Sequence, residues 1–208
     1  MADFCTVTDV EEFLQLDIAS DAAKLAACQR AITEASEAIR NECRQQIDLV
    51  ADDQVTFDVA TTRQTKLFLP ELPVASVAAV VEDGETLVEG ADEDYQLGNF
   101  GILHRRNGYW VQGVQVVVVT YTHGYASIPQ DIVDVATRAA SRAYQAGLKA
   151  ADAGGVPGIA SKGLGDFNVA YQAEQGGGVG EGVMGASAAR MLLLSEKDTL
   201  ARYRVKGP

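Results

Sequence analysis

Histidine and cysteine are scarce in this sequence, and their scarcity excludes several kinds of site. The chain has two histidines, His104 and His123, and three cysteines. None of these residues falls in a CxxC, HxxxH or HExxH spacing, so the usual zinc sites are not expected. We predict no catalytic residue, no cofactor-binding residue and no metal ligand.

Long apolar runs and basic charge are also in short supply. No apolar run approaches the roughly 20 residues of a membrane-spanning helix, and the acidic N-terminus lacks a signal sequence, so we expect cytoplasmic synthesis and no membrane partner. The 17 lysines and arginines are outnumbered by 29 aspartates and glutamates, which gives a net charge of −12. Such a chain is a poor candidate for gripping phosphates. Its charge fits either simple solubility or a wall past which DNA slides.

The three cysteines do not form a disulfide framework. Cys28 and Cys43 fall on one predicted helix, where their separation corresponds to about 22 Å. A disulfide tolerates about 7 Å between Cα atoms. Their helical spacing with Ile32 and Ile39 predicts that both are core residues.

Two helices are predicted within residues 1–49. Thr8 to Glu11 has the pattern of a capping box for a short helix over about residues 9–16. Ser20 and Asp21 are expected to cap a second helix. Its apolar stripe recurs at three- and four-residue steps and consists of Leu25, Cys28, Ile32, Ala35, Ile39 and Cys43.

Residues 50–126 change to the two-residue period of strands. Apolar and polar residues alternate over 55–59 and 65–69, Asp83-Gly84 is a hairpin signal, and 114–121 is a β-branched run. Successive short strands joined by tight turns predict an antiparallel sheet or a small barrel-like sandwich. The sheet is inserted between helices of one bundle.

A third bundle helix is predicted over residues 127–150. It begins at Pro129, and Gly147 is expected to stop it. Residues 151–208 then form an extended arm by composition, with a single strand over about 158–172 and a short final helix from Ser195. The predicted fold class is α+β: a small α-helical bundle with an inserted antiparallel β-sheet and an extended C-terminal arm ending in a short helix.

One glycine pattern imitates a cofactor motif. Gly180, Gly182 and Gly185 match GxGxxG, but that motif needs a strand before it and a helix after it. Here the pattern follows a glycine-rich linker, so no dinucleotide site is predicted.

The order of several stretches resembles a known family. LPELPVASVAAVVEDGETL, DYQL, GILHRRNGYW, VVVTYTHGY and IPQDIVDVATRAASRAY together resemble the head–tail connector, or adaptor, proteins of long-tailed double-stranded-DNA bacteriophages. The resemblance extends to the N-terminal helices and the final LARYR. It implies a structural virion protein at the head–tail junction, made in the host cytoplasm. Such proteins form a homo-oligomeric ring, commonly of twelve copies, beneath the portal.

The resemblance also implies the partners. The ring would bind the portal protein and the next neck or tail proteins, and DNA would pass through it without sequence-specific binding. Two alternatives stay open. One is a neck stopper or tail-completion protein, and the other is a small-ligand or enzyme domain with His123 or His104 as base.

Two sets of residues are predicted to serve the connector. The C-terminal arm is expected to dock on the portal because its apolar residues need a partner surface, unless the arm folds back on its own bundle. The docking residues are Met191, Leu192, Leu193, Leu194, Leu200, Arg202, Tyr203 and Arg204. Loop carboxylates are expected to line the DNA channel, and the candidates are Asp52, Asp53, Glu93 and Asp94.

Overall fold

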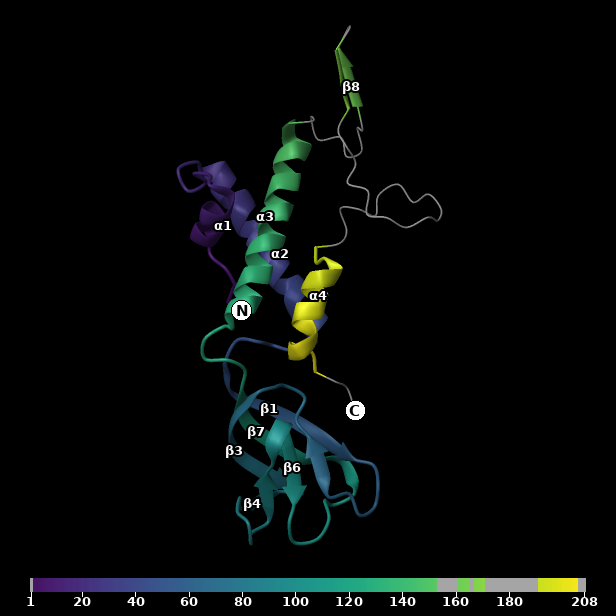
Figure 1. The fold of residues 1–208 in the computed structure, drawn as a ribbon. Helices are drawn as coiled ribbons and strands as arrows, with labels where there is room; N and C mark the ends of the chain where they lie inside the picture. Colours follow the sequence, from purple (N-terminus) through teal and green to yellow (C-terminus); the bar gives the residue numbers. More distant parts are fainter. Residues whose placement is uncertain (1, 153–160, 165–166, 171–190, 206–208) are drawn as a thin grey trace, which may run out of the picture. The chain divides into compact units, whose positions relative to one another are not determined.

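The computed structural model describes residues 2–152, 161–164, 167–170 and 191–205. Helices and antiparallel sheets both occur within them, so the predicted α+β class is confirmed (Figure 1). The chain divides into two compact units. The sheet unit comprises residues 1–2, 39–133 and 197–208, and the helical unit comprises residues 3–38 and 134–196.

The sheet unit contains two antiparallel sheets. The larger has the strand order β1-β7-β3-β4, and the smaller has the order β2-β6-β5. A 3-10 turn, η1 (Asn99–Gly101), precedes β6. The strands are β1 (Val50–Val59), β2 (Lys66–Phe68), β3 (Val74–Glu82), β4 (Glu85–Leu87), β5 (Tyr95–Leu97), β6 (Ile102–Arg105) and β7 (Gly113–His123).

Strand β7 is the centre of the larger sheet because it pairs with β1 on one side and with β3 on the other. Its β-branched residues suit a pleated surface that packs on a core. Val117, Val119 and Tyr121 are fully buried, and the residues between them are less so, as the two-residue period of a strand requires. The valine-rich run of the sequence therefore forms the best-paired strand.

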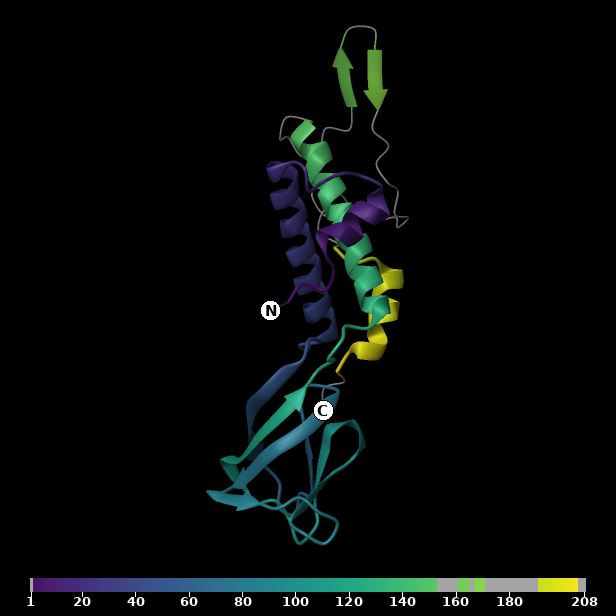
Figure 2. The ribbon, with the colours of Figure 1, turned by 90° about the vertical axis from the view of Figure 1, so that its left-hand side faces the viewer.

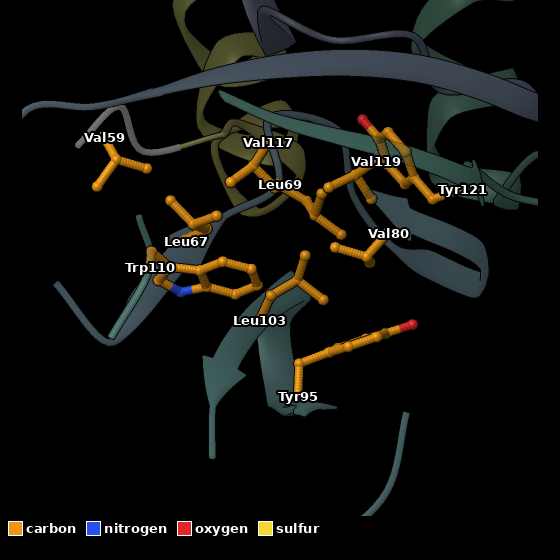
Figure 3. Close-up of a cluster of buried hydrophobic side chains, with 10 residues drawn as sticks. All are labelled: Val59, Leu67, Leu69, Val80, Tyr95, Leu103, Trp110, Val117, Val119 and Tyr121. Carbon is orange, nitrogen blue, oxygen red and sulfur yellow. The ribbon is translucent and has the colours of Figure 1, made fainter. Parts of the chain in front are cut away.

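Side chains from both sheets form one core cluster. Trp110 and Leu103 meet Val80 and Val117 of the larger sheet in this cluster (Figure 3). Two sheets that share one layer of buried side chains form a small sandwich. Of the two predicted arrangements, a single sheet or a small sandwich, the sandwich is the one observed.

The helical unit is built from α1 (Val7–Leu14) and from parts of two long helices, α2 (Ala22–Cys43) and α3 (Gln130–Asp152). The two long helices lie side by side (Figure 2). On α2 the predicted apolar stripe is buried from Cys28 onward, while Leu25 is half-buried, and on α3 Ala136 and Ala139 are buried. Small alanine side chains allow the two helix backbones to approach closely.

Two predicted helix boundaries were wrong. Thr6 caps α1: its hydroxyl accepts the Asp9 N–H at 3.2 Å, and the Asp9 carboxylate accepts the Thr6 N–H at 2.7 Å. Glu11, predicted to close a box with Thr8, instead accepts the N–H groups that follow the helix. Helix α3 continues to its end at residue 152, past Gly147, because one helical glycine costs only about 1 kcal/mol.

The remaining elements follow α3. Strands β8 (Ser161–Leu164) and β9 (Phe167–Ala170) pair antiparallel, where the sequence predicted a single strand. The reason is that alternation was visible only in the second of them. Helix α4 (Leu194–Leu200) and the 3-10 turn η2 (Ala201–Tyr203) close the described chain and confirm the predicted final helix. None of the helices within the described ranges is long and apolar enough to cross a membrane.

Candidate assembly sites

The C-terminal segment, defined here as residues 191–205, has a separate set of contacts in each unit. Its later half, from Lys197 onward, belongs to the sheet unit, where Leu200 has an exposed fraction of 0%. The Val205 N–H donates to the Cys43 carbonyl at 3.2 Å. The Gln45 side-chain amide donates to the Tyr203 carbonyl at 2.5 Å. These bonds fix the backbone of the segment against the end of α2.

Two carboxylates, those of Glu42 and Asp131, pair with the charged side chains of the later half of the segment. Glu42 pairs with Lys197 at 2.8 Å and with Arg204 at 3.9 Å. The hydrogen bond from Lys197 is the main reason that the pKa of Glu42 lies below its usual value. The segment is thereby tied to α2 by charge as well as by backbone hydrogen bonds.

Asp131, at the start of α3, is the second carboxylate that binds side chains of the later half. It pairs with Arg202 at 3.2 Å and accepts the Tyr203 hydroxyl at 2.6 Å. Burial, followed by the hydrogen bond to Asp131, raises the pKa of Tyr203 to about 12. The tyrosine therefore stays a neutral donor at any physiological pH.

The earlier half of the segment belongs to the helical unit and depends on one ion pair. Arg142 of α3 reaches both carboxylate oxygens of Glu196 at 2.7 Å and donates to the Met191 carbonyl at 3.0 Å. Glu196 is buried, and it also accepts the Leu193 N–H at 2.8 Å. A two-pronged arginine–carboxylate contact is among the more directional interactions in proteins, so it sets the direction of residues 191–196.

The predicted docking residues divide into two groups. Leu192 and Leu200 are buried within the chain, Met191 is half-buried, and Arg202, Tyr203 and Arg204 have the partners described above. Leu193 and Leu194 have exposed fractions of 48% and 72%. Leu193 and Leu194 lie next to the Arg142–Glu196 contact in the chain. Their side chains are therefore exposed to solvent on a backbone that this contact holds in place.

Asp52 and Asp53 lie in strand β1 and not in the predicted loop, and the four predicted channel carboxylates divide into two groups. Asp53 lies 3.2 Å from His123 Nε2, and Asp94 accepts the Val88 N–H at 3.0 Å and pairs with Arg105 at 3.4 Å. The hydrogen bond from Val88, with help from Arg105, lowers the pKa of Asp94. Asp52 and Glu93 are exposed. Asp53 and Asp94 therefore have structural partners, whereas Asp52 and Glu93 present their carboxylates to solvent.

Comparison with known families decides what kind of protein these surfaces belong to. A family model described as "Head completion protein" matches residues 3–139, more than half of the chain. The chain belongs to the head completion protein family. It is a structural protein of the head–tail region of a phage-like virion, and the resemblance found in the sequence is confirmed.

The chain also matches two solved structures at low sequence identity. This head completion protein is 15% identical to a chain in the neck of a native gene transfer agent particle computed with C12 symmetry, with 97% of this chain and 89% of that chain covered and a TM-score of 0.46. It is also 15% identical to a chain in the virion of a native gene transfer agent particle, with 97% and 90% covered and a TM-score of 0.50. No curated protein matches the sequence.

His123, one of the two histidines named in the enzyme alternative, has structural neighbours in this head completion protein. His123 is buried at the end of β7, its Nε2 faces Asp53, and its ring lies 5.0 Å from that of Tyr121. Asp131, which follows His123 by eight positions, binds Arg202 and Tyr203. Within the described residues no group of three or more His, Cys, Asp or Glu side chains is placed to hold a metal ion. Membership of a family of structural virion proteins disfavours the enzyme alternative.

The sequence offered fold-back of the arm as an alternative, but it did not predict which residues the C-terminal segment binds. Glu42 and Asp131 gave no local signal, because the residues they bind lie far along the chain. The one available hint was the excess of basic residues in the final LARYR against an acidic chain.

Proposed function

We propose that this head completion protein is a head–tail adaptor that forms a ring of twelve copies beneath the portal. The ring extends the DNA channel, and neck or tail proteins bind its other side. Family membership supports a structural role at the head–tail region. The copy number and the position beneath the portal come from the resemblance to connector proteins.

The observation that carries the docking part of this proposal is the exposed pair Leu193 and Leu194. These leucines are exposed while their neighbours Leu192 and Glu196 are buried. Soluble proteins seldom expose consecutive large apolar side chains without a partner. Because Arg142 already orders this stretch, docking on the portal need not bear the full entropic cost of ordering a free arm.

The test is a double substitution, Leu193→Ser with Leu194→Ser, in the full chain. Burial of the two leucines at an interface is worth about 2 kcal/mol or more, so we expect at least about a tenfold loss of affinity for portal-bearing heads. Both side chains face solvent in the free chain, so its melting temperature should not change. Val114→Ser is the matched control, because Val114 is also an exposed apolar residue.

Two results would count against the proposal. Undiminished binding of the double variant to heads removes the leucine pair from the docking surface. Binding of the wild-type chain to tails but not to heads favours the alternative of a stopper or tail-completion protein, one layer further from the head.

A further inference from the structure

The outer face of the smaller sheet exposes a large apolar side chain. Leu67, in the middle of β2, points into the core cluster (Figure 3). Successive side chains of a strand point to opposite faces, so Lys66 and Phe68 point outward. Phe68 lies opposite Ile102 of β6 and has an exposed fraction of 56%. It is therefore held in water on a regular strand.

A second phenylalanine is exposed in the turn between β5 and β6. Phe100 has an exposed fraction of 83% and a φ of 60°, a backbone conformation that bulky residues rarely adopt. The next residue, Gly101, is buried, and a Cβ atom there would come within 2.7 Å of Leu72. The Leu69 N–H donates to the Gly101 carbonyl at 2.9 Å. This packing holds the turn beside the end of β2, and strained residues that are held in this way gather at binding sites.

One edge of β2 has no strand beside it in the part of the chain that the structure describes. The Arg105 N–H donates to the Thr65 carbonyl at 2.8 Å. Alternate residues of an antiparallel pair bond to each other, so Lys66 and Phe68 direct their backbone groups to the free edge. The Lys66 carbonyl accepts the side-chain amide of Gln64 at 3.0 Å. The Lys66 N–H and the N–H and carbonyl of Phe68 are left for another strand.

The free edge of β2 also carries positive charge. From residue 59 to residue 70 the chain has two cations, Arg63 and Lys66, and no acid. Both cations are exposed, and neither has an ion-pair partner among the described residues. The acids that flank this stretch, Asp58 and Glu71, each accept a backbone N–H from another part of the chain, at 2.6 Å and 2.8 Å. The edge therefore favours an acidic partner.

We propose that the free edge of β2 receives an extended segment of the neck or tail protein that binds the ring on the side away from the portal. The segment adds a strand to the smaller sheet. In it an acidic and an apolar residue stand two positions apart, so that they lie beside Lys66 and Phe68. The inference rests on the proposed function for its partner, and it deepens that function by naming the surface and the chemistry of the contact.

The same features disfavour a second copy of this chain at the free edge. Strand β2 is short and carries Lys66, and natural sheets use short edges and lysines to prevent identical edges from pairing. Two β2 edges would also bring Arg63 and Lys66 of one copy against the same cations of the other. An acidic strand of a different protein meets no such repulsion.

The test measures how heads that carry variants of the full chain join purified tails. Joined particles are counted by electron microscopy over a range of tail concentrations. Lys66→Ala removes the charge and should raise the concentration for half-maximal joining about threefold. Lys66→Pro also removes the free N–H but no bond between β2 and β6, so the rise should be at least about tenfold. Phe68→Ser should raise it at least about tenfold as well, because an aromatic contact is lost.

Two controls match these variants. Val88→Ser removes a side chain with an exposed fraction of 55% just after β4, and it should leave tail joining unchanged. Lys66→Arg keeps the charge and should also behave as the wild type does. Added salt should weaken joining by the wild-type chain more than joining by Lys66→Ala, because only the former has the lysine charge to screen.

The amount of each variant on heads decides how the result is interpreted. Wild-type amounts of Lys66→Pro and Phe68→Ser on heads, with weakened tail joining, support the inference. Joining at the wild-type tail concentration overturns it. Loss of these variants from heads, while the chains still melt at the wild-type temperature, also overturns it, because the edge then faces the portal or a second copy.

Failure of the proposed function gives a different result. The wild-type chain is then absent from heads, and the free chain is sedimented with purified tails instead. Weaker binding of Lys66→Pro and Phe68→Ser than of the wild type supports the β2 edge as the tail-binding surface. Equal binding, or no binding of any chain, overturns it.

Discussion

Glu71 shows how a single residue can carry opposed electrostatic effects. Burial raises its pKa above the usual value, while the N–H of Gln46, at 2.8 Å, and the nearby His123 lower it by less. A carboxyl group with a raised folded-state pKa destabilises the fold when charged. Its unfavourable contribution therefore appears as the pH rises from about 4.5, the ordinary value, through the raised pKa.

We expect Glu71→Gln to be neutral or slightly stabilising at pH 7, by up to about 1 kcal/mol. Glutamine keeps an oxygen for the Gln46 N–H but has no charge to desolvate. Thermal melts from pH 4 to pH 8 should show the difference between variant and wild type shrinking toward acid pH. Glu71→Ala, which also removes the acceptor, is the control. A large loss of stability in Glu71→Gln at pH 7 would show that the charge is needed beside His123.

Burial of individual residues was predictable where the pattern was local. The spacing of Cys28 and Cys43 placed them in the core, and both are buried. Burial raises the pKa of the Cys43 thiol to about 11, so this thiol is unreactive at neutral pH. The partners of Arg202 and Arg204 were not predictable, because Asp131 and Glu42 approach them only in the folded chain.

At the scale of helices and strands, the kind of element was predicted better than its first and last residues. Caps and apolar stripes identified α1, α2 and α3, and alternation with hairpin signals identified an antiparallel β region. The exact ends depend on which of several possible caps and stops is used, and the sequence alone does not decide this. Thr6 and Thr8 both precede an acidic residue by three positions, and only folding decides that Asp9 closes the box. Gly147 ended the apolar pattern of α3 but not the helix itself, because helix packing outweighs the small helix-propensity cost of one glycine.

The attachment of the earlier half of the C-terminal segment depends on the Arg142–Glu196 pair. Replacing Arg142 by Met would leave a buried carboxylate with the Leu193 N–H as its main donor. We expect a loss of about 1–3 kcal/mol in unfolding free energy, because an unpaired buried charge is costly. Binding to portal-bearing heads should weaken as well, because the direction of Leu193 and Leu194 is no longer fixed.

A double-mutant cycle checks this expectation. Glu196→Gln added to Arg142→Met should recover part of the lost stability, since the remaining partner then carries no charge. Additive losses in the cycle would show that the two side chains contribute independently. In that case the leucine pair is positioned by something other than this contact.

At the scale of the whole molecule, acidic charge has a proposed use in the ring. A channel wall that carries carboxylates repels the phosphates of passing DNA, whereas lysines and arginines would retain them. Asp53 and Asp94 have structural partners, so changes there would confuse stability with charge. Asp52 and Glu93 are exposed and are the better probes. Asp52 has φ 51°, which asparagine adopts more readily than lysine.

We predict that Glu93→Lys combined with Asp52→Asn slows the release of DNA from assembled particles at low salt. Each lysine facing the channel would contact a phosphate, and added salt should restore the rate because counterions compete for such contacts. The free chain should melt as the wild type does, since both side chains face solvent.

Glu85→Lys, at an exposed site on β4, controls for a general change of charge. Equal rates in the double variant and the wild type at every salt concentration would remove Asp52 and Glu93 from the channel wall. Equal slowing by Glu85→Lys would assign the effect to net charge rather than to the positions of Asp52 and Glu93.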